Sequence, residues 1–433
     1  MTSRRPTVSR SGPASLRARG PARVLLVAPT NSYRTYAYIE AARRLGVDLV
    51  LASEGRHALV GAEVAGVQVD LHDPQAVDRL VAQARQRPFA GVVATDDASV
   101  VLTSRVAQAL GLPHNPPSAA RLSRRKDLAR AHLQAAGLPV PVHWRIDLGA
   151  PLEPQLQALM YPCVIKPVAL AGSRGVIRAD DPRQAAGVCG RIRRILDREK
   201  PGDPEERRYL LAERFIPGPE VALEGLLKDG ELQLLALFDK PDPLNGPFFE
   251  ETYYISPSRL APALQAHIRR RVAEACRAYG LREGPVHAEV RVWQDEAWIM
   301  EVASRTIGGE CARLLRSGTG FGLEELVMAR AMGEPVSLSA PEQAAGVLMI
   351  PIPKAGILRR VEGVLAARRV PGVEDLEISL REGYELVPLP EGSRYLGFIF
   401  ARGADPEAVE RALRAAHREL KVVVAPLWSL APA

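Results

Sequence analysis

Two runs of alternating apolar and polar residues lie close together in the chain, from His287 to Trp293 and from Ala297 to Arg305. Such alternation is typical of β-strands, and the intervening Gln294-Asp295-Glu296 has the composition of a turn, so we predict a β-hairpin. One face is wholly apolar and is expected to pack on a core; it carries Ala288, Val290, Val292, Trp298, Met300 and Val302. The other face carries His287, Glu289, Arg291, Ile299, Glu301, Ala303 and Arg305.

The length of the turn decides where the two glutamates of this hairpin lie. If Trp293 pairs with Ala297 across a three-residue turn, Glu289 lies directly opposite Glu301. Like charges in that arrangement destabilise a sheet, so a cation is expected between them, and Mg²⁺ is commonly held by one or two carboxylates together with substrate phosphates. A two-residue turn would place the glutamates on opposite faces, and an exposed face with solvated charges is the alternative interpretation. Arg305 is suited to hold a phosphate or a developing oxyanion.

Between residues 23 and 110, buried-type strands alternate with amphipathic helices. The strands are expected at Arg23–Pro29, Asp48–Ala52, Val64–Val69 and Phe89–Thr95, and the helices at Thr35–Leu45, Pro74–Arg87 and from Asp97 through Leu110. This order predicts a parallel sheet with helices on both faces. Ligands of such sheets bind beyond the carboxyl ends of the strands, where Thr30-Asn31-Ser32 and Asp96-Asp97 lie, although helix N-capping also explains these residues.

The middle of the chain holds a basic helix and a loop rich in small residues. The helix is expected from Ser118 to Gly137, with most of its arginines on a solvated face, and a strand from Tyr161 to Val168 places Lys166 before the loop of residues 169–176. Glycines in such a loop allow close approach of the backbone to a ligand, and its N–H groups can cradle phosphate. An ordinary hairpin turn is the alternative.

Composition places the chain among soluble globular proteins. It has 433 residues, of which 47% are apolar and 25% charged, and no apolar run approaches the ~18 residues of a membrane span. Its formal charge of +7 falls to +1 without the six arginines of residues 1–23, so the body carries no nucleic-acid-binding signature. Four scattered cysteines without a C-x-x-C pair argue against a zinc site or disulfide framework and favour the cytoplasm.

Several strings of the chain are similar, in this order, to the ATP-grasp superfamily. They are GLPHNPPSAARLSRRKDLAR, AERFIPGPEVALEG, GPFFEETYYISPSRL and EVASRTIGG, together with Lys166 and the Gly172–Gly175 loop. Within the superfamily the chain most resembles the carboxylate–amine ligases of the L-amino acid ligase type, and its layout is also similar to that of biotin carboxylase. The resemblance runs from about Arg23 to the C-terminus and implies an α/β ATP-grasp fold, with an α+β ATP-binding part.

The resemblance implies a role for each matching residue. Lys126 and Lys166 would contact the ATP phosphates, with Gly172, Ser173 and Gly175 as a mobile cover. The segment of Glu213, Phe215 and Ile216 would bind the adenine, and Glu220 the ribose. Glu289 and Glu301 would bind Mg²⁺, with Mn²⁺ as an alternative, and the expected catalytic residues are Arg305, Lys166 and His287. Glu250, Glu251, Gly308 and Gly309 are candidate substrate contacts.

The resemblance also implies a division of the chain. We expect a disordered tail at 1–22, an N-terminal α/β domain at 23–117, an ATP-binding domain at 118–338 with a lid subdomain at about 140–212, and a C-terminal αβ domain at 339–433. One departure from the family is Ser304, which stands among the residues after Glu301 where the family usually has an asparagine.

The implied function is an ATP- and Mg²⁺-dependent ligase that joins a carboxylate and an amine, with amino acids as substrates, through an acyl phosphate. The resemblance implies that the binding partners are small-molecule substrates and that the chain binds neither nucleic acid nor membranes. It also implies a homodimer. Two alternatives stay open: a biotin-carboxylase-like enzyme that uses bicarbonate, and an ATP-binding protein without ligase activity. The absence of an Ala/Val-Met-Lys-Met motif argues against a biotin carrier within this chain.

Overall fold

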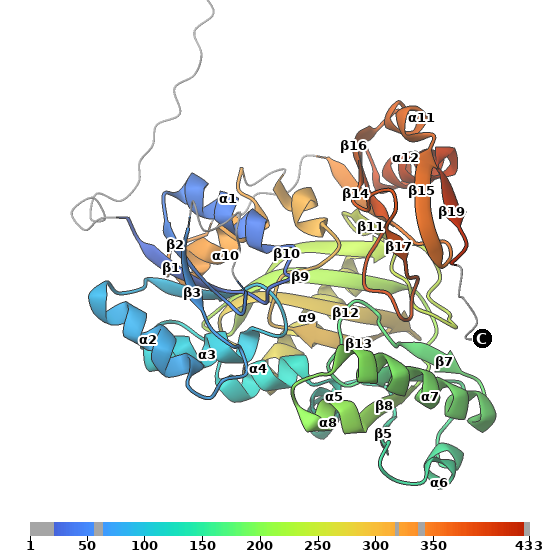
Figure 1. Cartoon of the computed structure of the whole chain (residues 1–433), viewed down its shortest axis with the longest axis horizontal. Helices are drawn as coiled ribbons and strands as arrows, with labels where there is room; N and C mark the ends of the chain where they lie inside the picture. Colours follow the sequence, from blue (N-terminus) through green and yellow to red (C-terminus); the bar gives the residue numbers. More distant parts are fainter. Residues whose placement is uncertain (1–20, 56–63, 317–319, 337–342, 428–433) are drawn as a thin grey trace, which may run out of the picture.

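The computed structural model describes residues 21–55, 64–316, 320–336 and 343–427. Within these ranges the strands form four sheets, and Figure 1 shows the smaller ones placed around a large central sheet. The expected tail at residues 1–22 lies almost wholly outside the described residues. No helix in these ranges combines the length and apolar character needed to cross a membrane.

The N-terminal sheet is parallel, in the order β3-β2-β1-β4. Its elements are β1 (Arg23–Val27), α1 (Thr35–Leu45), β2 (Asp48–Ser53), β3 (Ala65–Gln68), α2 (Ala76–Gln86), β4 (Gly91–Ala94) and α3 (Val100–Ala109). Val24 and Leu26 pack in the same core as residues of α1, whereas Leu25 and Val27 pack with α2 and α3. The predicted parallel sheet with helices on both faces is therefore confirmed.

The chain then forms two short helices, α4 (Pro117–Arg124) and α5 (Lys126–Ala135), where a single basic helix was predicted. The single helix is wrong because Arg125 has an extended backbone and the N–H of Lys126 donates to the carbonyl of Val168 at 2.8 Å. The solvated face is also wrong for two of its arginines, since Arg125 and Arg130 are 1% and 3% exposed. Both pair with carboxylates, which is how buried charges are tolerated.

An antiparallel sheet in the order β5-β8-β6-β7 follows, with helices on it. Its elements are β5 (His143–Asp147), α6 (Leu152–Gln157), β6 (Cys163–Pro167), β7 (Ile177–Ala179), α7 (Pro182–Glu199), α8 (Pro204–Arg208) and β8 (Tyr209–Arg214). Ile192 and Leu196 of α7 share a core with Ile165 and Leu210 of the sheet. This sheet occupies the region expected to act as a lid.

The central sheet has eight strands in the order β13-β12-β9-β10-β11-β14-β18-β16. They are β9 (Glu220–Lys228), β10 (Glu231–Lys240), β11 (Tyr253–Ser256), β12 (Gly284–Trp293), β13 (Glu296–Ala303), β14 (Ala344–Ile350), β16 (Val373–Ile378) and β18 (Gly397–Gly403). Val221 and Leu223 of β9 pack with α9 (Pro262–Tyr279), while Ala222 and Leu226 pack in the core that includes α1. The N-terminal sheet thus lies over one face of the central sheet.

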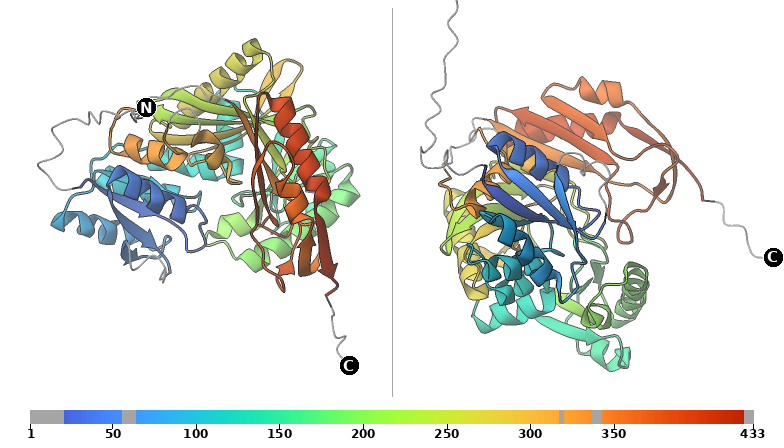
Figure 2. Two further views of the ribbon diagram at one scale, coloured as in Figure 1. Left: turned by 90° about the horizontal axis from the view of Figure 1, so that it is seen from above. Right: turned by 60° about the vertical axis from the view of Figure 1, so that its left-hand side comes forward.

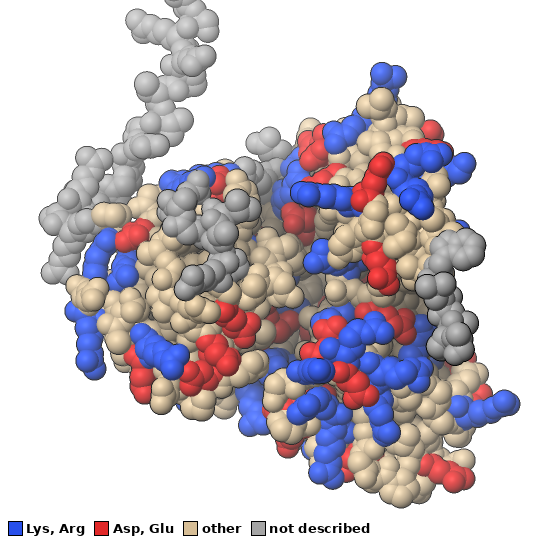
Figure 3. Space-filling model, in the orientation of Figure 1, with Lys and Arg blue, Asp and Glu red and all other residues tan. Residues whose placement is uncertain are grey.

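The C-terminal part continues the central sheet and adds a small one, in the order β17-β15-β19. Its further elements are β15 (Gly356–Glu362), α11 (Val364–Arg368), β17 (Glu385–Leu386), α12 (Pro406–Glu419) and β19 (Lys421–Ala425). Before this part, a 3-10 helix at Cys311–Arg316 and α10 (Leu323–Ala331) follow β13 and pack in the core that includes α1. Figure 2 shows α12 lying along the C-terminal end of the central sheet. On the face seen in Figure 3, acidic and basic side chains are interspersed.

Candidate active site

The predicted hairpin exists as β12 and β13, and Glu289 lies opposite Glu301, but the turn is not the one expected. Trp293 pairs with Glu296 across a two-residue turn, whose central residues Gln294 and Asp295 both have positive φ. A β-bulge between Glu289 and Val290 in the register leaves Met300 without a partner and shifts the strands by one residue. The bulge therefore restores the pairing of the glutamates that a two-residue turn alone would prevent.

The faces predicted for β13 are wrong before Met300, because the turn has two residues, and right after it, because of the bulge. Ala297 and Ile299, not Trp298 and Met300, lie in the core under the hairpin. After the extra residue the alternation changes phase, so Val302 faces the core as predicted.

Two lysines and an arginine surround the facing glutamates. Lys126 Nζ lies 3.3 Å from Glu301 Oε2, and Lys240 Nζ lies 3.3 Å from Glu289 Oε1. Arg305 reaches within 3.9 Å of Glu301 and pairs with Asp97 at 3.1 Å. Carboxylate oxygens that face one another suit Mg²⁺, which prefers oxygen ligands and leaves room for phosphates, so the donor set fits the expected ion.

Lys240 lies at the centre of a carboxylate cluster that the sequence did not indicate. It pairs with Glu220 at 2.7 Å and Glu251 at 2.5 Å as well as with Glu289. The three glutamates each offer an oxygen within 4.8 Å of the others. Burial, although it opposes the charge, is outweighed by the three glutamates, so the pKa of Lys240 is raised.

The cluster also shifts the pKa of its members. Burial and the Glu289 charge raise the pKa of Glu251 to about 7. Glu289 therefore belongs both to this cluster and to the pair that it forms with Glu301. Lys240 pairs with Glu220 between β9 and β10 only because the register shifts between Leu234 and Ala236, so a count from the turn at Asp229-Gly230 would have placed it opposite Pro219 instead.

The expected adenine end is built around the buried carboxylate of Glu213. It pairs with Lys166 on one oxygen and with Arg130 on the other. Burial would raise its pKa, but Arg130 and Lys166 outweigh that effect and hold the pKa at about 2. Phe215 lies beside Phe249 with 6.4 Å between ring centroids, and the carbonyl of Ile216 accepts from Arg291 at 2.7 Å.

Arg291 ties this end to the predicted ribose contact, because its Nε donates to Glu220 at 2.8 Å. Arg291 was expected only as one polar residue of the hairpin face. It is 3% exposed and fixes both Ile216 and Glu220.

The Gly172–Gly175 loop has the conformation that glycine favours. Gly172, Ser173 and Gly175 all have positive φ, and a Cβ on Gly175 would lie 2.9 Å from Pro167 Cγ. The N–H of Gly175 donates to the carbonyl of Pro390 at 3.0 Å, so the loop contacts the C-terminal part. Lys126 Nζ donates to the carbonyl of Leu170 at 3.0 Å, which connects the loop to Glu301.

His287 lies between two carboxylates. Its Nδ1 is 3.5 Å from Glu224 and its Nε2 is 3.6 Å from Glu289. Burial opposes protonation, but these glutamates prevail and raise the pKa of His287. Glu224, which is fully buried and whose pKa is raised by burial, was missed, although it stands on the same strand as Glu220.

The predicted substrate contacts are divided between two places. Glu251 pairs with Lys240 and belongs to its carboxylate cluster. Glu250 precedes Glu251 in the sequence, and burial raises the pKa of Glu250. A Cβ on Gly308 would approach Tyr33 and Arg34 of the N-terminal domain, and one on Gly309 would collide with Met349.

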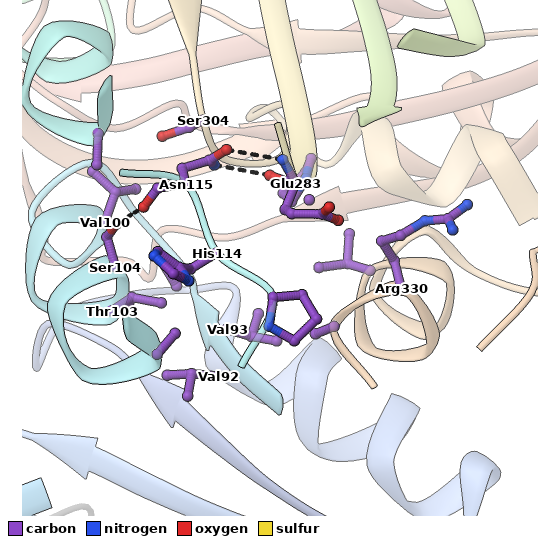
Figure 4. A pocket seen from close by; sticks show the side chains of 18 residues that line it. Val92, Val93, Val100, Thr103, Ser104, His114, Asn115, Glu283, Ser304 and Arg330 are labelled. Atoms are coloured by element: carbon purple, nitrogen blue, oxygen red, sulfur yellow. Dashed lines mark hydrogen bonds between the residues drawn. The ribbon is translucent and has the colours of Figure 1, made fainter. Parts of the chain in front are cut away.

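Ser304 does not contact the glutamates in the described structure. Its Oγ lies 2.7 Å from Ser123 Oγ, and it lines a cavity of about 70 Å³ between α3, β12 and α10. Figure 4 shows Asn115 at this cavity, where its side-chain amide bonds the backbone of Glu283. Asn115 thereby fastens the segment that leaves the N-terminal domain to the start of β12.

Three families match the chain in succession. Residues 39–114 match the ATP-grasp N-terminal domain, residues 159–313 the ATP-grasp domain, and residues 348–425 the L-amino acid ligase C-terminal domain 2. The chain is 30% identical to carnosine synthase 1 of Gallus gallus over 79% of this chain and 39% of that protein. It is 23% identical to alanine–anticapsin ligase of Bacillus subtilis over 60% of this chain and 57% of that protein. The chain thus spans well under two thirds of both curated relatives.

Solved structures share the fold over nearly the whole chain. The L-amino acid ligase from Bacillus licheniformis superimposes with a TM-score of 0.80 at 27% identity, covering 93% of this chain and 99% of that one. The biotin carboxylase domain of a Hydrogenobacter thermophilus carboxylase, solved with MgADP, has a TM-score of 0.63 at 17% identity over 93% and 90% of the two chains, which shows the fold alone. The chain therefore contains an ATP-grasp N-terminal domain, an ATP-grasp domain and the L-amino acid ligase C-terminal domain 2, in this order.

Proposed function

We propose that the chain joins the carboxylate of one amino acid to the amino group of another, consuming ATP and releasing ADP and phosphate. The observation that carries the proposal is the pair of opposed glutamates, Glu289 and Glu301, with Lys126, Lys240 and Arg305 around them. With Mg²⁺ held by the two glutamates, this set would offer positive charge to a triphosphate and a carboxylate in one place.

The first step activates the carboxylate. A carboxylate oxygen of the substrate attacks the γ-phosphorus of ATP, ADP leaves, and an acyl phosphate forms. Mg²⁺ held by Glu289 and Glu301 would neutralise charge on the phosphates. Lys126 and Lys166 are proposed to contact the phosphates. Lys166 lies on β6, the strand that leads to the Gly172–Gly175 loop, and Lys126 donates to the carbonyl of Leu170 shortly before that loop.

The second step forms the amide. The neutral amine attacks the acyl carbon, the carbon–oxygen bond to phosphate breaks and phosphate leaves; the nitrogen gives one proton to an acceptor in the site and keeps one N–H in the amide. Arg305 is proposed to hold the oxyanion of the tetrahedral intermediate. Its guanidinium is fixed by Asp97 and by the carbonyl of Thr306 at 3.1 Å, so little reorganisation is needed during the reaction.

The amine is proposed to bind where the N-terminal domain meets Arg305. The carboxylate oxygens Asp96 Oδ2 and Asp97 Oδ1 are buried and have no hydrogen-bond donor among the described residues. Buried acceptors without donors are costly, and an amino group would supply donors. Both residues follow β4, at the carboxyl end of the parallel strands, where ligands of such folds bind.

The test is phosphate release from Mg-ATP with single and paired amino acids, combined with mass spectrometry of the products and with Glu301→Ala as the blank. We expect phosphate release that requires a pair, and a product lighter than the two amino acids by one water. Phosphate release that depends on bicarbonate, or ATP binding without turnover on any pair, would contradict the proposal.

A further inference from the structure

The buried side chain of Arg130 bonds three groups that belong to different parts of the candidate site. Its Nε pairs with Glu213, while Nη1 and Nη2 donate to the carbonyls of Ile299 and Met300 at 2.6 and 2.7 Å. Arg130 lies on α5, and its partners lie on β8 and β13. One guanidinium therefore connects a helix to both strands.

The two carbonyls belong to the bulge that sets the register of the hairpin. Val290 pairs with Ile299, and the next pair is Glu289 with Glu301, so Met300 is the extra residue. If the register of the turn continued without it, Glu301 would pair with Ala288, whose side chain is in the core. Glu301 would then point away from Glu289.

An extra residue in a sheet needs other hydrogen-bond partners, because the bulge interrupts the ladder. Arg130 supplies two charged donors to this point. Charge-assisted hydrogen bonds are among the stronger ones in proteins, and a guanidinium holds its donors in a fixed plane.

We propose that Arg130 is a positioning residue: it fixes the bulge at Met300 and so places Glu301 opposite Glu289, and it orients Glu213 toward Lys166. The inference rests on the proposed function, in which Glu289 and Glu301 hold Mg²⁺. Arg130 would set the geometry of the Glu289–Glu301 pair, a role that is distinct from general support of the fold.

The test measures Mn²⁺ affinity by electron paramagnetic resonance, with the full-length protein saturated with a non-hydrolysable ATP analogue. Removal of Arg130 alone would leave the buried carboxylate of Glu213 with Lys166 as its one remaining ion-pair partner and would destabilise the fold. The informative comparison is therefore Glu213→Gln against the double variant Arg130→Met, Glu213→Gln, which removes that charge in both proteins. Arg121→Met, which changes an arginine that is 56% exposed, is the matched control.

We expect Arg121→Met to keep the Mn²⁺ affinity within a few-fold of the unchanged protein, and the double variant to bind Mn²⁺ at least about tenfold more weakly than Glu213→Gln alone. Arg130→Lys, which keeps a charge beside Glu213 but lacks the planar fork, should fall between them. Equal Mn²⁺ affinity in Glu213→Gln and in the double variant would overturn the inference. Glu301→Gln separates this failure from that of the proposed function, because unchanged Mn²⁺ affinity there would remove Glu301 from the metal site.

Discussion

Arg305 is held in place by carboxylates from two sides of the proposed site. It lies between Asp97 of the N-terminal domain and Glu301 of the metal pair, so its position depends on both sides of the site. Burial opposes its charge, but Asp97 and Glu301 outweigh that effect and raise its pKa, so the guanidinium stays charged.

Replacing Arg305 with glutamine is expected to lower kcat by about a hundredfold, the usual effect of losing one oxyanion-stabilising donor. The KM for ATP should change only a few-fold, because Arg305 is proposed to act on the acyl group. Steady-state kinetics check the expectation, with Arg105→Gln on the exposed side of α3 as a control. A rise in the KM for ATP at unchanged kcat would show that Arg305 serves nucleotide binding.

Glu213 gives a pH-dependent contribution to stability. Its pKa is about 2 in the folded protein, below the ordinary value of 4.5, so it stabilises the fold above pH 4.5 and loses that contribution as the pH falls toward 2. Glu213→Gln should reduce the free energy of unfolding by about 3 kcal/mol at neutral pH, from 1.36 kcal/mol per pKa unit.

Urea unfolding between pH 3 and pH 7 checks this expectation, since the difference between the two proteins should shrink toward the acidic end. The same difference at all pH values would mean that Glu213 contributes through packing and not through its charge.

At the scale of elements, the backbone of the Gly172–Gly175 loop is constrained at Gly175 by the residue that lies under it. Gly175 has a φ of 68° and packs against Pro167. Both features exclude a larger residue without a shift of the loop, which is expected to cover the phosphates.

Gly175→Ala is therefore expected to raise the KM for ATP several-fold and to cost about 1 kcal/mol of stability. Gly187→Ala is the matched control, because Gly187 lies within helix α7 and a Cβ there would meet no other atom within 4 Å. That control should be neutral or slightly stabilising. Equal effects of the two substitutions on the KM for ATP would contradict the role of the loop.

At the scale of the whole molecule, the C-terminal part holds the region expected to act as a lid. Arg191 on α7 forms a bidentate pair with Glu391, with distances of 2.6 and 2.9 Å, next to the bond between Gly175 and Pro390. Closing a lid excludes water from a reactive acyl phosphate, so these contacts bear on whether the intermediate reaches the amine.

Arg191→Gln is expected to increase phosphate release in the absence of the amine two- to several-fold, because water would enter the site more often. The Arg191–Glu391 pair is partly exposed, so its contribution to the free energy of unfolding stays within about 1 kcal/mol. Phosphate assays with the carboxylate substrate alone measure this uncoupled turnover. Arg194→Gln, on the exposed side of the same helix, should leave it unchanged. A double variant with Glu391→Gln that is no worse than Arg191→Gln would confirm that the two act as a pair.

The sequence by itself determined the alternating N-terminal strands and helices and the hairpin of the two glutamates. Both follow from local periodicity, which depends only on which neighbouring side chains must be buried. The string resemblance then indicated the ATP-grasp family, which the comparisons confirm.

Only the tertiary structure decided the register of that hairpin and the partners of its charges. The two-residue turn and the bulge at Met300 together bring Glu301 opposite Glu289, and no local pattern reveals an inserted residue that is stabilised by Arg130 on a distant helix. Lys240 and Glu224 entered the site for the same reason, whereas Asp97 was expected at the ligand-binding end of the sheet and only its pairing with Arg305 came from the structure. Their chemistry comes from contacts between residues far apart in the chain, and these exist only once the sheets have packed.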